Sequence, residues 1–254
     1  MQLKNIARAG LVLFVLSSGQ AQATPSTTYW TPMTPDIQSY GVLHFGVDNY
    51  FTGNDSFPTD MGLTLGVLPF DKVQMEIGID VLEPSDDPVY FNAKIGTPEN
   101  TLFEGAPTLQ LGIFNAGTNG GETNQNVGYM VIGKTIPWLG RLSIGPYIGN
   151  GHVLRDSSGD KENAGFMAAF DRGFFPKKNA AGEEYNRVVL AADYAYGDNA
   201  IGGGGFGVYY FFTKNISLLT GPVWFNDSGI NGSWKWTAQL DINLAVFGPS
   251  ATGL

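Results

Sequence analysis

The sequence predicts an all-β fold: a closed antiparallel up-and-down β-barrel of about 12 strands that spans a membrane. Three observations support it. Apolar and polar residues alternate with a period of two along most of the chain. Charged residues make up 15% of the chain, below the roughly 25% of ordinary soluble domains. Short apolar turns alternate with longer polar loops. A soluble protein needs a charged surface, whereas a surface that faces lipid does not.

The first 23 residues have the pattern of a secretory signal peptide. Lys4 and Arg8 give a positive start, residues 10–16 form an apolar run, and residues 21–23 (AQA) make a small-x-small cleavage sequence. The apolar run is shorter than the about 20 residues of a membrane-spanning helix. We therefore expect residues 24–254 to form a single β-barrel domain, with short N-terminal and C-terminal segments on the periplasmic side.

The twelve predicted strands are defined by alternation. In residues 73–81, VQMEIGIDV, the side chains of Val73, Ile77 and Val81 fall on one face, and those of Glu76 and Asp80 fall on the other. The full set of predicted strands is 38–50, 61–68, 73–81, 89–96, 107–114, 126–135, 140–149, 163–171, 186–196, 203–212, 216–225 and 233–246.

The connections between these strands differ at the two ends of the predicted barrel. Short turns at 69–72, 136–140 and 213–215 follow even-numbered strands, so an antiparallel meander places them together. Polar loops at 51–60, 115–125, 151–162 and 226–232 follow odd-numbered strands and gather at the other end. The connections 97–106 and 172–185 are long although they fall on the short-turn side. They are either periplasmic excursions or places where the strand prediction fails.

In these features the mature chain resembles bacterial outer-membrane β-barrel proteins as a class. The resemblance implies an outer-membrane location, lipid and lipopolysaccharide against the wall, insertion by the barrel-assembly machinery, and long external loops. It also implies aromatic girdles at both interfaces. The candidates are Phe70, Trp138 and Phe212 at the short-turn end, and Tyr50, Phe51, Tyr194, Tyr196, Trp224 and Trp234 toward the polar loops. The competing fold is a soluble periplasmic β-sandwich, which also alternates but has polar faces richer in charge.

If the apolar faces meet lipid, the polar faces line a lumen of mixed charge. Placing Asp80 opposite Tyr90 in a hairpin puts Glu76 opposite Lys94, within cross-strand contact. Glu76 and Asp80 lie about 13 Å apart along their strand, too far for the acid pair of a glycosidase. The lumen-lining candidates are His44, Glu76, Asp80, Tyr90, Lys94, Lys134, Arg141, Arg187, Asp193, Lys235 and Asp241.

Composition excludes several functions. The chain has 14 basic and 23 acidic residues, so it has no electrostatic reason to bind nucleic acid. It has no cysteine, which rules out zinc ribbons and thiol catalysis. An outer-membrane lipid hydrolase needs a Ser–His site, but Phe45 and Gly46 follow His44 without a serine. We expect no enzyme activity, no cofactor and no metal.

The leading function is a narrow, porin-like channel for small solutes. Barrels of eight strands are filled by their own side chains, and those of 16–18 strands hold wide channels. Twelve strands lie between these limits, so a narrow or partly plugged lumen is expected. The alternative is a structural or adhesion barrel that acts through its external loops. A soluble periplasmic binding protein is a further, less favoured possibility.

Overall fold

The computed structural model describes residues 27–53 and 55–248. Strand β2 has two residues and forms a small hairpin with the end of β1, which leaves twelve long strands to build the wall. The elements are β1 (Val42–Thr52), β2 (Asp55–Ser56), β3 (Thr59–Gly66), β4 (Gln74–Glu83), β5 (Val89–Thr97), β6 (Thr108–Gly117), β7 (Val127–Ile136), β8 (Gly140–Ile148), β9 (Ala164–Lys178), β10 (Glu184–Ala195), β11 (Gly203–Thr213), β12 (Ile216–Phe225), α1 (Ser228–Asn231) and β13 (Trp234–Ala245).

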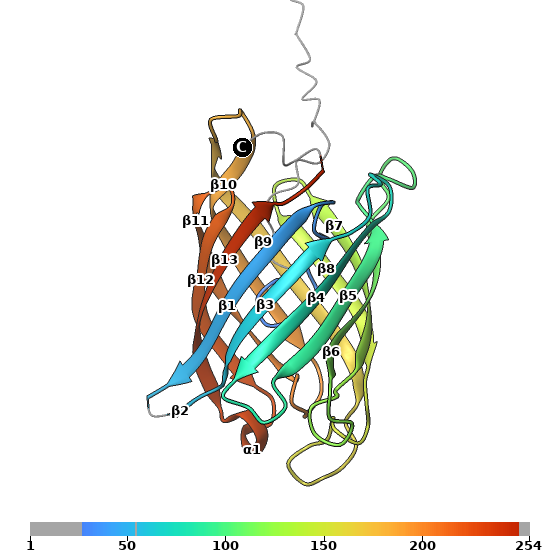
Figure 1. The fold of residues 1–254 in the computed structure, drawn as a ribbon, viewed down its shortest axis with the longest axis vertical. Helices are drawn as coiled ribbons and strands as arrows, with labels where there is room; N and C mark the ends of the chain where they lie inside the picture. The colour runs from blue at the N-terminus through green and yellow to red at the C-terminus, as the bar shows by residue number, and fades with distance from the viewer. Residues whose placement is uncertain (1–26, 54, 249–254) are drawn as a thin grey trace, which may run out of the picture.

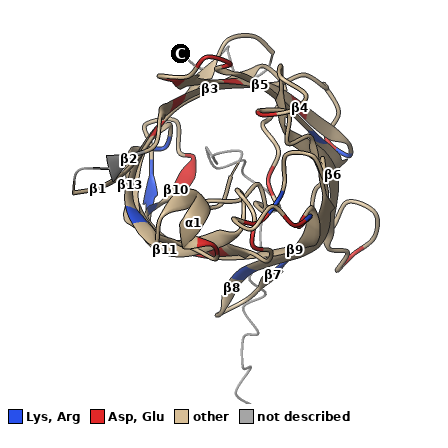
Figure 2. Ribbon diagram, turned by 90° about the horizontal axis from the view of Figure 1, so that it is seen from below, with Lys and Arg blue, Asp and Glu red and all other residues tan. Residues whose placement is uncertain are grey.

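The twelve long strands form a closed antiparallel barrel (Figures 1 and 2). They pair in chain order, and β13 pairs with β1 from Val42 opposite Ala245 to Phe51 opposite Trp236. A closed wall leaves no unpaired strand edge, as a lipid environment requires. The predicted fold class is confirmed. In the described part of the chain, no helix is long and apolar enough to cross a membrane.

The outer face of the wall is apolar, whereas the inner face carries the buried polar side chains together with apolar side chains of β7 to β12. Ile77 and Leu244 are 45% and 51% exposed, whereas their strand neighbours Glu76 and Asn243 are buried. A β-sandwich would instead bury its apolar faces against each other. The exposed apolar wall is the arrangement expected of a barrel surrounded by lipid.

The predicted aromatic girdles are present with one exception. Tyr50 is 9% exposed and faces the lumen, because it shares the inward side of β1 with Asp48 and His44, which lie two and six residues before it. The other eight predicted girdle residues are all more than 40% exposed: Phe51, Phe70, Trp138, Tyr194, Tyr196, Phe212, Trp224 and Trp234.

The two ends of the barrel differ as predicted (Figure 1). Short connections lie at the end where the chain leaves β13, and longer ones lie at the end that carries α1. The predicted long connection at 172–185 is wrong. β9 runs on to Lys178 and β10 begins at Glu184, so a long hairpin replaces the expected loop. The alternation is lost there because Phe174 and Phe175 are consecutive and Pro176 follows. Residues 98–107 remain a long connection at the short-turn end.

Residues 27–41, here called the insert, lie inside the barrel. Tyr29 and Met33 have no exposed surface, and Thr28, Thr31 and Thr34 are at most 4% exposed. A short N-terminal segment on the periplasmic side is predicted from the sequence, whereas the structure places residues 27–41 in the lumen. The expectation of a partly plugged lumen agrees with this arrangement.

Candidate functional site

The insert is held at its innermost part by one carboxylate of the wall. Asp193 on β10 points inward, and its Oδ2 accepts hydrogen bonds from the backbone N–H groups of Tyr29 (3.0 Å), Trp30 (3.0 Å) and Thr31 (2.8 Å). The Thr31 hydroxyl donates to the same oxygen at 2.8 Å. A buried carboxylate requires such partners, so Asp193 serves as an anchor for the insert.

Glycines of β11 let the insert approach the wall. A Cβ atom at Gly207 would lie 2.4 Å from the Tyr29 ring, and one at Gly205 would lie 2.7 Å from it. The Tyr29 hydroxyl donates to the carbonyl of Pro222 at 3.0 Å. The glycine-rich run at 202–207 therefore provides space for a tyrosine of the insert.

Trp30 of the insert contacts the polar-loop end of the barrel. Its ring packs edge-on against Tyr50 and Phe225, with centroids 5.3 Å away in each case, and lies 6.4 Å from Phe57. Its indole N–H donates to the carbonyl of Ile201 at 2.9 Å. The aromatic contacts and this hydrogen bond fix the tip of the insert beneath the loops.

An ion-pair network holds the part of the insert nearer the short turns. Arg141 on β8 pairs with Asp36 of the insert and with Asp171 on β9, the latter at 2.9 Å from Nε to Oδ1. The backbone N–H of Gln38 donates to Glu76 Oε2 at 2.7 Å. The insert is thus attached to several strands around the barrel.

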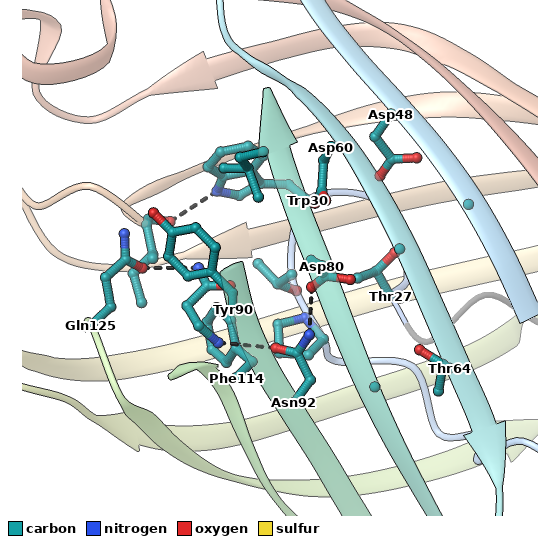
Figure 3. Close-up of a pocket in the computed structure, with 18 of the residues that line it drawn as sticks. Thr27, Trp30, Asp48, Asp60, Thr64, Asp80, Tyr90, Asn92, Phe114 and Gln125 are labelled. Atoms are coloured by element: carbon teal, nitrogen blue, oxygen red, sulfur yellow. Dashed lines mark hydrogen bonds between the residues drawn. The ribbon is translucent and has the colours of Figure 1, made fainter. Parts of the chain in front are cut away.

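The insert leaves an open space of about 340 Å³ in the lumen, here called the acidic cavity. It lies against β1, β3, β4 and β5. Figure 3 shows three of its carboxylates, Asp48, Asp60 and Asp80, which come from the neighbouring strands β1, β3 and β4, together with Trp30 of the insert. The residues that give it its character are Trp30, Asp48, Asp60, Asp80, Tyr90 and Asn92.

A second cavity of about 500 Å³ lies at the short-turn end. It is here called the turn-side cavity. Its lining includes Trp138, Arg141 and Asp171 of the wall and Thr28 and Asp36 of the insert. Because residues of the insert line both cavities, the position of the insert controls how much of the lumen is open.

The predicted pair of Glu76 and Lys94 is confirmed. The two residues lie opposite each other in the β4–β5 register, as do Asp80 and Tyr90. Lys94 Nζ is 3.5 Å from Glu76 Oε1, and both side chains are at least 95% buried. Lys94 also donates to the carbonyl of Asp36 at 3.1 Å. Paired charges of the wall therefore hold the insert as well as each other.

Most of the other predicted lumen residues also face inward. His44 and Asp241 are buried side by side, with His44 Nε2 3.5 Å from Asp241 Oδ1. Lys235 is 1% exposed, and its ammonium lies 4.5 Å from the centroid of the Phe57 ring. Asp80 and Tyr90 line the acidic cavity.

Lys134 and Arg187 do not line the lumen cavities. Lys134 lies an even number of residues along β7 from Met130 and Ile132, which face outward. The two-residue period therefore turns Lys134 away from the lumen as well. Arg187 donates to the carbonyls of Phe211 and Phe212 at 2.9 Å each, which holds it in the wall.

Lys134 instead forms an ion pair outside the lumen. Its ammonium lies 2.6 Å from Glu99 Oε1, in the connection between β5 and β6. Partial burial raises the pKa of Glu99, but hydrogen bonds from Lys134 and Thr135 outweigh this effect and hold the pKa below its usual range. The pair fastens this long connection to the barrel.

Two carboxylates of the acidic cavity, Asp48 and Asp60, are absent from the predicted candidates. Asp48 lies four residues after His44 on the same strand, so the two-residue alternation of β1 places both side chains on the inward face and could have identified Asp48. Asp60 falls in a predicted loop, whereas β3 begins at Thr59. The insert gave no comparable signal, because its prolines and polar residues show no period.

The environment of His44 differs from that of a catalytic histidine. The hydroxyl of Ser217 donates to Asp241 Oδ2 at 3.1 Å rather than to His44. His44 Nδ1 lies 3.2 Å from Asn243 Oδ1. A nucleophile must hydrogen-bond to its base, and this serine does not do so. Among the described residues, no group of three or more His, Asp or Glu side chains is arranged to hold a metal ion.

Comparisons with known proteins agree with the fold. No family model matches the sequence, and no curated protein matches it. Among solved structures, the chain is similar to a KdgM porin with a TM-score of 0.52 and 8% identity, over 81% of this chain and 99% of that one. It also matches a mutant of the Rh. blastica porin with a TM-score of 0.40 and 9% identity, over 73% of this chain and 55% of that one. The likeness to the KdgM porin supports the barrel architecture.

Proposed function

We propose that the protein is a narrow channel for small solutes in an outer membrane. The observation that carries the proposal is the acidic cavity, an open space lined in part by carboxylates inside a closed barrel whose outer wall is apolar. The insert narrows the lumen without filling it, so permeation is restricted to small molecules. The proposal includes no catalytic step, and lipid and lipopolysaccharide would contact the apolar wall.

Planar-bilayer recording of the refolded protein tests the channel. We expect stepwise conductance from the folded protein and none from the same preparation after boiling. A variant lacking residues 27–38 should give larger steps, because the deleted segment occupies the lumen. A folded wild-type protein that never exceeds the lipid background would overturn the proposal.

The membrane location has its own test. A closed β-barrel in detergent migrates differently before and after boiling, because only the boiled form is unfolded. Separation of inner and outer membranes should place the protein in the outer fraction. Recovery in the soluble fraction, with no change in mobility on boiling, would instead favour a periplasmic protein.

A structural or adhesion barrel is the alternative function, and one feature of the loops favours it. The backbone N–H of Ser157 donates to Asp227 Oδ2 at 2.7 Å, so the β8–β9 loop and the segment before α1 are joined. Hydrogen bonds from Ser157 and Gly229 hold the pKa of Asp227 below its usual range. Two results would support this alternative. The barrel would show no conductance, and shortening its loops would abolish attachment of cells to a surface.

A further inference from the structure

The charges that line the acidic cavity are unevenly paired. Five carboxylates contribute to the lining, and His44 and Lys94 are the basic side chains among the described lining residues. Lys94 pairs with Glu76, and His44 lies against Asp241. The carboxylates that remain after these pairings are Asp48, Asp60 and Asp80.

These three carboxylates lie close together on the wall. Asp48 on β1 is directly opposite Asp60 on β3, and Asp80 on β4 is opposite Gly62, two residues along β3 from Asp60. Like charges directly opposite each other in a sheet are destabilising. The arrangement therefore lowers the stability of the barrel, so these carboxylates are not explained by a structural role.

The described residues supply these carboxylates with few partners. In the part of the chain that the structure describes, none of the ion pairs within 4 Å involves any of these three carboxylates. Asp80 accepts a hydrogen bond from the amide of Asn92. The Oδ1 atom of Asp60 is buried and has no hydrogen-bond partner. A buried carboxylate without a partner is costly, and a cation in the cavity would offset that cost.

The geometry points to a path for cations, and we propose that Asp48, Asp60 and Asp80 make the channel select small cations over anions. This inference rests on the proposed channel function. Carboxylates that line a pore select for cations, and the low-dielectric walls of a narrow cleft concentrate their field. The aromatic residues Trp30 and Tyr90 belong to the same lining, and the faces of aromatic rings attract cations.

The insert contributes to this selectivity by its position. Asp193 accepts hydrogen bonds from the insert and Arg141 pairs with Asp36 of the insert, and neither of these two charged residues lines the acidic cavity. The open space lies against the strands that carry the three unpaired carboxylates. A lumen that contains charges of both signs is thereby left with an open part that is acidic.

The test is the reversal potential of the channel in a bilayer between unequal KCl solutions. For the wild type we expect the sign that indicates preference for K⁺ over Cl⁻. In the triple variant Asp48→Asn, Asp60→Asn, Asp80→Asn, the permeability ratio should fall toward unity. The matched control is Asp198→Asn, which alters an exposed residue of the β10–β11 loop and should keep the wild-type ratio.

The outcomes separate the two proposals. Conductance without preference, or with preference for Cl⁻, would overturn the cation path and leave the channel intact. The same holds if the triple variant keeps the wild-type ratio. Absence of conductance would overturn the channel and the cation path with it. If the triple variant fails to fold, the wild-type ratio and the single variant Asp80→Asn decide the question.

Discussion

The carboxylate of Asp193 and the backbone N–H of Thr31 are joined by a 2.8 Å hydrogen bond, although 162 residues separate them in the chain. The same carboxylate oxygen also accepts from Tyr29 and Trp30. One side chain of the wall thus satisfies three consecutive N–H groups that no strand of the sheet pairs. The insert depends on this residue for its position.

Replacement of Asp193 with alanine should therefore loosen the insert and destabilise the protein. A buried donor left without an acceptor costs about 1–3 kcal/mol, so we expect the free energy of unfolding to fall on the order of 3 kcal/mol. Urea unfolding followed by tryptophan fluorescence measures the change. The exposed Asp198→Ala variant is the control, and equal stability of the two variants would contradict the anchoring role.

Arg141 should control how firmly the insert sits at the short-turn end. The variant Arg141→Met removes the partner of both Asp36 and Asp171. Because the Arg141 side chain is 26% exposed, the loss of stability should be modest, about 1–2 kcal/mol. We also expect larger and noisier single-channel currents, since the insert gains freedom.

A double-mutant cycle isolates the contact between Arg141 and Asp36. The effects of Arg141→Met and Asp36→Asn should not add, because each removes the same interaction. Arg155→Met changes an exposed arginine of the β8–β9 loop and should leave current noise unchanged. Additive effects on noise would mean that Arg141 does not act on the insert through Asp36.

The pair of Glu76 and Lys94 should show the behaviour of a buried ion pair. The variant Lys94→Met leaves Glu76 charged and buried without its partner, and we expect a loss of about 3–5 kcal/mol. The double variant Lys94→Met, Glu76→Gln should recover part of this loss, because it removes the unpaired charge. Recovery is measured by urea unfolding. A double variant less stable than Lys94→Met would contradict this account.

Sequence reasoning succeeded for features set by local alternation. The register of β4 and β5, and with it the contact between Glu76 and Lys94, followed from the two-residue period and a hairpin connection. The inward direction of Asp193 and Asp241 followed from the same period. The alternation of inward and outward side chains continues along each strand. A small error in the predicted end of a strand therefore does not change which side chains face inward.

The insert could not be predicted in the same way. Its contacts pair each residue with a different distant strand, as Tyr29 with Pro222 and Asp36 with Arg141. No period records such contacts in a single sequence. Lys134 fails for a different reason: polar residues near strand ends occur on both faces, because the apolar band of the lipid ends there.

Gly112 should be required for a tyrosine to lie across the inner wall. A Cβ atom at Gly112 would lie 2.3 Å from the ring of Tyr129, its cross-strand partner. We expect Gly112→Ala to cost about 1–3 kcal/mol through overpacking. Gly128 is the matched control, since a Cβ there would meet only a carbonyl oxygen 3.8 Å away. Equal unfolding midpoints for the two alanine variants would contradict the prediction.

The turn between β9 and β10 should weaken at low pH. Hydrogen bonds from Lys214 and Asn179 lower the pKa of Glu183 below its ordinary value of 4.5. A lowered pKa means that the ionised form stabilises the turn above that value, and that this contribution is lost as the pH falls through the folded-state pKa. The carboxylate side chain is 42% exposed, so the effect should stay below about 1 kcal/mol.

Hydrogen exchange of residues 179–183 tests this pH dependence. Between about pH 6 and about pH 3, protection of the turn should decrease in the wild type after correction for the intrinsic exchange rate. The variant Glu183→Gln cannot ionise and should show weaker protection with little pH dependence. A pH profile shared by both proteins would assign the effect to another group.

The insert directly precedes β1 in the chain, yet it contacts the strands at the other end of the sequence. Its partners include Asp193 on β10, Pro222 on β12 and Gln239 on β13, whose side-chain amide donates to the carbonyl of Tyr29 at 3.0 Å. All three partners follow the insert residues that they contact by more than 160 residues in the chain. β13 also forms the seam with β1, so the strand that closes the barrel also completes the binding of the insert. A closed wall and an occupied lumen therefore depend on the same strand.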